Sequence, residues 1–145
     1  MLTCVKWKST YSAHFKIDFG VRQGSVLSPH LFAIYINDIA NGLGFSQRAF
    51  VVLYADDILL VAPSLTELQS LFKMCELELA WLDMCINTKK SCCMRIGSRF
   101  DINCTQITSI DGMSLPWVTE LRYLGVYIIS SRKFKCSLDY AKRAF

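Results

Sequence analysis

Two adjacent aspartates, Asp56 and Asp57, interrupt the longest aliphatic run of the chain, VVLYADDILLVA at residues 51–62. The residues around them favour a protein interior, and none of them carries a positive charge. An ionised carboxylate buried without a partner costs several kcal/mol, and two neighbouring carboxylates also repel each other. We therefore expect a group from outside this segment to neutralise the pair.

The position of the pair along the chain predicts a tight hairpin. Successive side chains of a straight strand point to opposite faces, so adjacent aspartates approach one site only where the chain turns. We expect strands at about 49–54 and 58–61, with Ala55, Asp56 and Asp57 in the turn between them. Two carboxylates there would suit Mg²⁺, which prefers hard oxygen ligands. Aspartate is also frequent in ordinary turns, so the pair by itself is compatible with a turn that binds nothing.

Composition places the chain among globular proteins. It has 145 residues, of which 52% are hydrophobic and 19% charged, enough for one core. The longest apolar run is shorter than a membrane span needs, and the start MLTCVKWKST lacks the apolar region of a signal peptide. We expect an intracellular protein of the nucleus, the cytoplasm or both, neither secreted nor bound to a membrane.

The cysteines fit a reducing compartment. There are seven, an odd number, without a CxxC pair: Cys4, Cys75, Cys85, Cys92, Cys93, Cys104 and Cys136. We expect buried thiols that act as small hydrophobic residues rather than disulfides or metal ligands.

Charge is unevenly distributed although the net charge is only +4. Residues 51–87 hold six acidic residues and one lysine, whereas basic residues dominate after residue 88. The C-terminal half could meet phosphates, or it could simply be a solvated face.

Periodicity and turn residues predict the elements of the first half. Residues 5–21 alternate in two halves and indicate two strands with a polar turn near residues 9–12. Ser28 and Pro29 begin a helix, which glycines at 42 and 44 end. The apolar face of this helix is expected at Leu31, Phe32, Ile34, Tyr35 and Ile39.

The second half is predicted to contain one long helix and several strands. Ser64 and Glu67 form a capping box, and the helix runs to about Met84. Its apolar positions are Leu68, Leu71, Phe72, Cys75, Leu79 and Leu82. A strand with Cys92, Met94 and Ile96 on one face, a hairpin at Asp111-Gly112, a strand at 122–129 and a final helix at 137–145 follow. The fold class is α+β, a mostly antiparallel sheet covered by two helices.

Four motifs in order identify a resemblance. GVRQGSVLSPHLF at residues 20–32, YADD at 54–57, NTKKS at 87–91 and RYLGVYI at 122–128 resemble the palm motifs of reverse transcriptases of non-LTR (LINE-like) retrotransposons. The RQG form of the first motif and the alanine of YADD are similar to the branch that also contains group II introns and retrons. The resemblance covers nearly the whole chain, from about residue 15 to residue 129.

The resemblance implies a fold and an activity. Residues 1–130 would be part of a right-hand polymerase palm, and residues 131–145 the beginning of the thumb. The activity would be RNA-directed DNA polymerisation, in which two Mg²⁺ ions, replaceable by Mn²⁺, support nucleotidyl transfer onto a primer 3′-hydroxyl. The partners would be an RNA template, a DNA primer and deoxynucleoside triphosphates.

The resemblance also assigns roles near the aspartates. Asp56 matches the metal-ligating aspartate, Asp57 its acidic partner, and Tyr54 the residue packed beneath the primer end. In the first motif, a loop that contacts the template and the incoming nucleotide corresponds to Arg22, Gln23 and Gly24. For Arg22, an exposed side chain without a special role is an equal alternative.

Two further sets of residues are implied by the later motifs. Lys89 or Lys90 falls where the family has a lysine proposed as general acid to the leaving pyrophosphate; a basic helix end that answers the helix dipole is the alternative. Tyr123, Leu124 and Gly125 match the primer-grip hairpin, although taken alone they are typical of an ordinary strand.

One departure from the family pattern affects the expected activity. The first palm motif, a strand with another metal-ligating aspartate, should precede GVRQG, and Asp18 is the only acidic residue there. We expect Asp18 to be a hairpin residue, the missing motif and the fingers to lie in an upstream segment of the same polyprotein, and the isolated chain to be inactive. The alternatives are a non-catalytic palm remnant that binds RNA or a hybrid, and a reverse transcriptase similar to group II intron maturases.

Overall fold

The computed structural model describes residues 2–18, 24, 26–42 and 48–137, and the side chains of 38–42 are outside this description. The chain forms two compact units, residues 1–38 and 39–145. In the described ranges no helix is both long and apolar enough to cross a bilayer.

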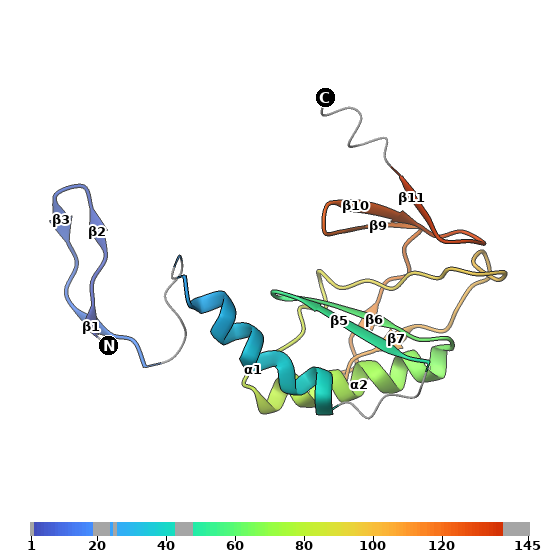
Figure 1. Ribbon diagram of the computed structural model, residues 1–145, viewed down its shortest axis with the longest axis horizontal. Helices are drawn as coiled ribbons and strands as arrows, with labels where there is room; N and C mark the ends of the chain where they lie inside the picture. The colour runs from blue at the N-terminus through green and yellow to red at the C-terminus, as the bar shows by residue number, and fades with distance from the viewer. Residues whose placement is uncertain (1, 19–23, 25, 43–47, 138–145) are drawn as a thin grey trace. The chain divides into compact units, whose positions relative to one another are not determined.

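Two helices and antiparallel strand pairs make up both units, so the predicted α+β class is confirmed. Within the described ranges the strands form one three-stranded sheet and four two-stranded ones rather than a single sheet. Figure 1 shows these short pairs along the chain.

The first unit begins with a hairpin made of four short strands. Strand β1 (Leu2–Thr3) pairs with β4 (Phe15–Lys16), and β2 (Lys6–Trp7) pairs with β3 (Thr10–Tyr11). The hairpin was predicted, but its turn comes earlier than residues 9–12, because Lys8 takes the positive φ of 55° that reverses the chain.

Helix α1 (Ser28–Gly42) begins at the predicted Ser-Pro pair and ends at the predicted glycine. Its expected apolar face is mostly exposed where it is described: Leu31, Ile34 and Tyr35 are exposed and Phe32 is half-buried. Ile36, which was not predicted, is buried, and the side chain of Ile39 lies outside the described residues. Helical spacing marks which side chains share a face, but burial also needs a partner surface, which the spacing does not specify.

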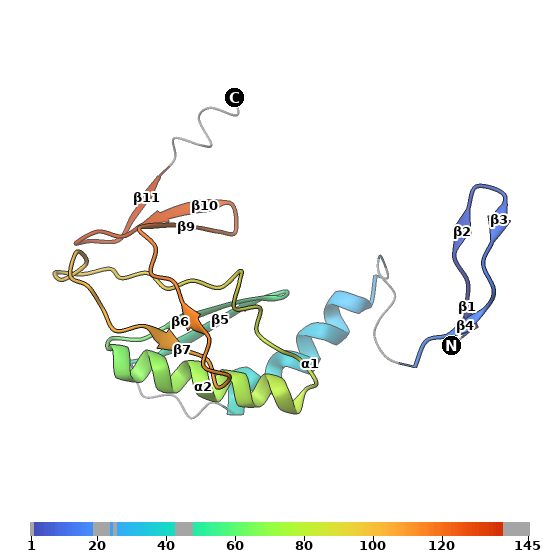
Figure 2. The ribbon, with the colours of Figure 1, turned by 180° about the vertical axis from the view of Figure 1, so that it is seen from behind.

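The second unit contains the hairpin of β5 (Phe50–Tyr54) and β6 (Asp57–Val61), paired from Phe50↔Val61 to Tyr54↔Asp57. Helix α2 (Leu65–Trp81) packs against β6, as Figures 1 and 2 show from opposite sides.

Both ends of α2 are capped by local hydrogen bonds. At its start the Glu67 amide donates to the Ser64 hydroxyl over 3.2 Å, which confirms the serine half of the predicted capping box. The Glu67 carboxylate accepts from the Ser64 hydroxyl over 3.3 Å. At its end the Met84 and Asp83 amides donate to the carbonyls of Leu79 and Ala80 in a Schellman motif. The helix therefore ends three residues before the predicted Met84, because Asp83 adopts a left-handed φ of 55°.

The core of the second unit lies between α2 and the strands that follow it. The predicted apolar positions of α2 are confirmed, with Leu71, Phe72, Cys75 and Leu79 buried. The buried cluster consists of Phe72, Cys93, Ile107 and Leu115. Burial raises the pKa of the Cys75 and Cys93 thiols to about 11, so both pack as neutral groups. All seven cysteines are free; the exposure of Cys85 and Cys92 differs from the expected burial.

The hairpin of β7 (Ile107–Thr108) and β8 (Ser114–Leu115) confirms the turn predicted at Asp111-Gly112. Gly112 has a φ of 80° and its amide donates to the Ser109 carbonyl. The Gln69 side chain of α2 bonds both backbone groups of Thr108, at 2.7 and 2.9 Å, and thereby fixes this hairpin on the helix.

The strand predicted around residues 92–96 is wrong, because these residues form only an isolated bridge, and the face predicted to be buried is also not the buried one. Cys93 is buried and forms an isolated parallel bridge with Trp117, whereas Cys92 and Ile96 are exposed. The Cys93 amide donates to the Pro116 carbonyl over 2.8 Å. Since the side-chain period of an extended chain is two, this one-residue difference exchanges the two faces.

A three-stranded antiparallel sheet closes the described chain. It contains β9 (Glu120–Tyr123), β10 (Val126–Ile129) and β11 (Lys135–Ser137), in the order β11-β10-β9. The single strand predicted at 122–129 is wrong, because Leu124 and Gly125 turn the chain. The predicted helix at 137–145 lies mostly outside the described residues, and its first residue is in β11. The division into palm and thumb at residue 130 stays a prediction.

Candidate active site

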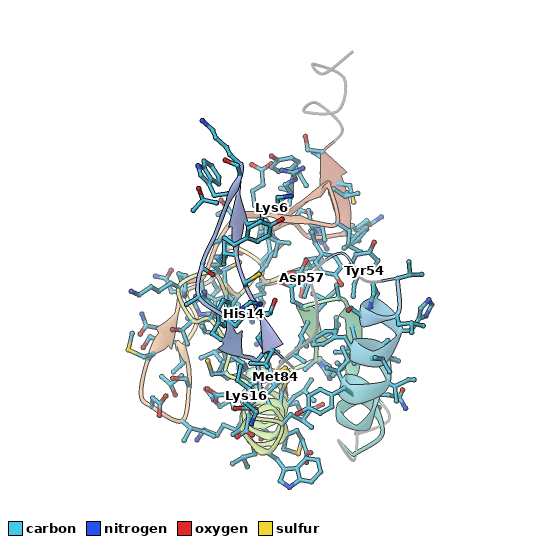
Figure 3. The ribbon with its side chains drawn as sticks, turned by 90° about the vertical axis from the view of Figure 1, so that its left-hand side faces the viewer. Lys6, His14, Lys16, Tyr54, Asp57 and Met84 are labelled. Carbon is cyan, nitrogen blue, oxygen red and sulfur yellow. The ribbon has the colours of Figure 1, made fainter. Side chains whose placement is uncertain are left out.

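The predicted hairpin turn carries the aspartates, although one of them is in a strand. Tyr54 pairs with Asp57, so only Ala55 and Asp56 form the turn and Asp57 begins β6. Ala55 has a φ of 50°, a left-handed conformation that costs an L-residue about 1–2 kcal/mol. Asp56 and Asp57 therefore both lie at the turn end of the hairpin, where Figure 3 labels Tyr54 and Asp57.

The aspartates differ from expectation in their environment. Both side chains are exposed, so hydration replaces the neutralising group that burial would have required. Within the described residues no ion pair to either carboxylate is recorded. The premise that these carboxylates are buried is therefore wrong, and a metal is not needed to explain why the fold tolerates them.

The carboxylates of Asp56 and Asp57 are suitable ligands for a divalent cation, but two of them are too few to complete a site. Carboxylate oxygens are the ligands that Mg²⁺ and Mn²⁺ prefer. In the parts of the chain that the structure describes, no group of three acidic, histidine or cysteine side chains gathers around one point. Asp18 pairs with Lys16 of its own hairpin over 2.6 Å, and both side chains are exposed.

The structure connects Tyr123, at the end of β9, to the aspartate turn. Burial raises the pKa of the Tyr123 hydroxyl above its usual 10.0, and the charge of Asp57 raises it further. The hydroxyl oxygen is buried and has no hydrogen-bond partner among the described residues. Two residues that the resemblance assigned to different motifs are therefore close enough to interact electrostatically.

The turn after Tyr123 is also a two-residue turn. Tyr123 pairs with Val126, and Leu124 and Gly125 have φ values of 49° and 82°. Positive φ at both central residues is the type I′ turn, which matches the twist of the flanking strands. The residues predicted as a primer grip thus do form a hairpin.

The two candidate lysines lie in a turn after α2. The Lys90 amide donates to the Asn87 carbonyl over 3.0 Å, and both lysine side chains are exposed. Neither makes an ion pair with a described residue. The last turn of α2 holds no basic residue, and the lysines begin eight positions beyond Trp81, so the structure gives no support to the helix-dipole alternative.

The first motif is described in part. Arg22 and Gln23 lie outside the described residues, so their predicted roles stay predictions. Gly24 has a φ of 80°, and a Cβ built on it would meet no atom within 4 Å. A glycine at position 24 is therefore explained by the backbone conformation and not by crowding from neighbouring atoms.

Sequence reasoning missed the proximity of Tyr123 to Asp57. A usable signal is present, since both two-residue turns follow a tyrosine directly, at Tyr54 and Tyr123. That repetition predicts two similar hairpins, but it does not predict that one would bring its tyrosine near the other.

Comparison with known proteins gives one match. The model of the family described as "Reverse transcriptase (RNA-dependent DNA polymerase)" matches residues 1–128. Searches of curated proteins and of solved structures return no match. The matched range contains the aspartate turn and the tyrosine hairpin, and it covers most of the 145 residues. The chain therefore belongs to the reverse transcriptase family, whose members are RNA-directed DNA polymerases that generally use divalent metal ions.

Proposed function

We propose that the chain is the palm portion of a non-LTR retrotransposon reverse transcriptase, with Asp56 and Asp57 as ligands of divalent cations. The observation that carries the proposal is the exposed carboxylate pair at a two-residue turn, in the same unit as the Tyr123 hairpin. An intracellular location, in the nucleus, the cytoplasm or both, is part of this proposal.

Each motif contributes one task to the proposed reaction. When bound, two Mg²⁺ ions would activate the primer 3′-hydroxyl and neutralise the leaving pyrophosphate. Asp56 and Asp57 hold the cations, and Lys89 or Lys90 donates a proton toward the pyrophosphate. The loop with Arg22, Gln23 and Gly24 contacts the template and the incoming nucleotide.

The tyrosines and the second hairpin are proposed to position the primer. Tyr54 supports the primer end from β5, while Leu124 and Gly125 fix its backbone. A glycine in this turn leaves no side chain between the hairpin and a nucleic-acid strand.

Polymerisation by the isolated chain is not expected. A two-metal site uses several carboxylates to offset the charge of both cations, and the described residues supply two. We therefore propose that the chain binds a cation weakly and extends no primer alone. Templated products in a primer-extension assay with Mg²⁺ or Mn²⁺ would contradict this part of the proposal.

Manganese binding tests the ligand assignment without requiring activity. The free Mn²⁺ signal in electron paramagnetic resonance gives the affinity of the wild-type chain, of Asp56→Asn/Asp57→Asn, and of Asp111→Asn as a matched exposed acid in another turn. We expect the double variant to lose at least roughly tenfold in affinity and Asp111→Asn to match the wild type. Equal affinity in all three chains would remove Asp56 and Asp57 as ligands.

A non-catalytic role is the second candidate. Lys89, Lys90, Arg132 and Lys133 are all exposed, so their charges are available to phosphates of RNA or of a hybrid. Charge reversal at these four positions should weaken RNA binding and reduce its salt dependence. Unchanged RNA affinity in the reversed variant would exclude this surface.

A further inference from the structure

The hairpin of the first unit presents aromatic rings to solvent. Trp7 is 77% exposed and Tyr11 60% exposed. A two-stranded hairpin is at best marginally stable and gains little from rings that stay in water. These rings are therefore available to a partner.

The two rings lie on opposite faces of the hairpin. Lys6 is directly opposite Tyr11, and Trp7 is directly opposite Thr10, so the pairs alternate between faces. The Lys6 ammonium lies 5.3 Å from the centre of the Tyr11 ring on one face, and Trp7 stands on the other. The rings do not combine into one apolar patch.

Positive charge surrounds the exposed rings. Residues 2–18 contain three lysines and one acid, Asp18, which is paired with Lys16. Lys6 and Lys8 flank Trp7 in the sequence, with no acid between residues 2 and 17. Figure 3 labels Lys6, His14 and Lys16 along the same hairpin. The tip of the hairpin is therefore cationic and aromatic together.

This arrangement fits single-stranded nucleic acid better than a protein surface. A stable protein interface needs about 800 Å² on each partner, with a continuous apolar centre. A strand of RNA or DNA needs only one ring per base and a cation near each phosphate. We propose that the β2–β3 hairpin binds single-stranded nucleic acid, with the Trp7 ring stacked on a base and Lys8, its neighbour in the turn, on an adjacent phosphate.

The proposed surface is formed by other residues than the candidate metal ligands. It lies in the first unit, whereas Asp56 and Asp57 belong to the second. Binding at the hairpin therefore requires neither cations nor polymerisation, and it stands whether or not the aspartates are ligands.

Fluorescence anisotropy with a labelled oligouridine about 12 nucleotides long tests the proposal. Trp7→Ala should weaken binding by roughly 5- to 150-fold, and Trp7→Phe should restore most of the affinity. Trp81→Ala is the matched control, because Trp81 is 76% exposed on α2 and should leave affinity unchanged. Circular dichroism of each variant verifies that the fold is retained.

Salt dependence separates the lysine from the ring. Lys8→Glu should lower the slope of log affinity against log salt by about 0.7, the contribution of one phosphate contact on a single strand. Trp7→Ala should leave that slope unchanged.

Three results would overturn the proposal. If Trp7→Ala bound RNA as tightly as the wild type, the stacking contact would be excluded. If duplex RNA competed as well as single-stranded RNA, the preference for single strands would be excluded. Sedimentation showing self-association that Trp7→Ala abolishes, with RNA affinity unchanged, would assign the hairpin to a second copy of the chain.

Discussion

Two hairpins of the second unit reverse the chain within two residues, and their turns differ in backbone conformation. The β9–β10 turn has positive φ at both Leu124 and Gly125, with a glycine at the second position. The β5–β6 turn has positive φ at Ala55 alone, and Asp56 follows it. Both turns therefore place a non-glycine residue, Leu124 or Ala55, in the left-handed region, and they differ at the second central position.

The difference teaches that the second central position decides which residue a turn can carry. Gly125 has a φ of 82°, at which a residue with a side chain is strained, whereas Asp56 does not have a positive φ. The aspartate turn therefore carries a carboxylate at the position where the other turn has a glycine. A glycine at residue 55 would still remove the cost of the left-handed conformation there.

The largest expected effect is at Gly125. Gly125→Val places a β-branched residue at a φ of 82°, and we expect the free energy of unfolding to fall by about 2 kcal/mol. Urea unfolding followed by circular dichroism measures the change. Asp56→Val, at the equivalent second position but without positive φ, should cost clearly less; equal losses would show that the two turns do not differ in this way.

The two tyrosines before the turns should respond differently to loss of the hydroxyl. The Tyr123 hydroxyl is buried and has no hydrogen-bond partner among the residues that the structure describes, which costs about 1–3 kcal/mol. Tyr123→Phe should therefore raise the free energy of unfolding by about 1 kcal/mol. Tyr54 is exposed, and Tyr54→Phe should change it by less than about 0.5 kcal/mol. Destabilisation by Tyr123→Phe would indicate a hydrogen bond to that hydroxyl.

The wild type and Tyr123→Phe should also differ in how their free energy of unfolding depends on alkaline pH. The pKa of Tyr123 is raised in the folded chain, so the unfolded chain releases this proton first and the wild type loses stability as pH rises above about 10. Tyr123→Phe lacks this loss, so the stability difference between the two chains should widen above pH 10. A constant difference across that range in urea titrations would contradict the raised pKa.

Ala55→Gly should relieve the strain in the aspartate turn. Removing about 1–2 kcal/mol of left-handed strain, less the backbone entropy of glycine, leaves a gain of roughly 0.5 kcal/mol in the free energy of unfolding. If the conformation of Ala55 orients the carboxylates of Asp56 and Asp57 toward a cation, Mn²⁺ affinity should fall in the same variant. A more stable chain with unchanged Mn²⁺ affinity would separate the strain from metal binding.

The smallest expected effect on stability is at the aspartates themselves. Asp56→Asn and Asp57→Asn are exposed, isosteric changes, and each should alter the free energy of unfolding by less than about 0.5 kcal/mol. Loss of Mn²⁺ affinity in these variants would then report the ligands and not the fold. A large loss of stability would instead assign the carboxylates a structural role.

Local patterns predicted most of the second unit correctly. The capping box of Ser64 and Glu67, the buried face of α2 and the Asp111-Gly112 turn each depend on neighbours a few residues apart. The spacing of residues along the chain predicts such local interactions. The strand around Cys93 was predicted on the wrong face because the choice depends on Trp117 and Pro116, which are more than twenty positions away.

At the candidate site, too, local sequence predicted some features and distant segments decided others. The turn at the aspartates followed from the geometry of strands, but the exposure of Asp56 and Asp57 did not. An aliphatic sequence around a residue indicates an interior only when another layer covers both sides of the hairpin. Only the arrangement of the second unit shows that the turn end extends into solvent.

The sequence by itself determined the α+β class, the capped start of α2, the hairpins at the aspartates and at Asp111-Gly112, and the membership of the reverse transcriptase family. Only the tertiary structure decided that the aspartates are solvated, that Cys93 and not Cys92 is buried, and that the Tyr123 hydroxyl lies buried within the electrostatic reach of Asp57. The physical reason is range. Turns, caps and periodicity act over a few residues, whereas burial and electrostatic contact depend on which distant segments pack together.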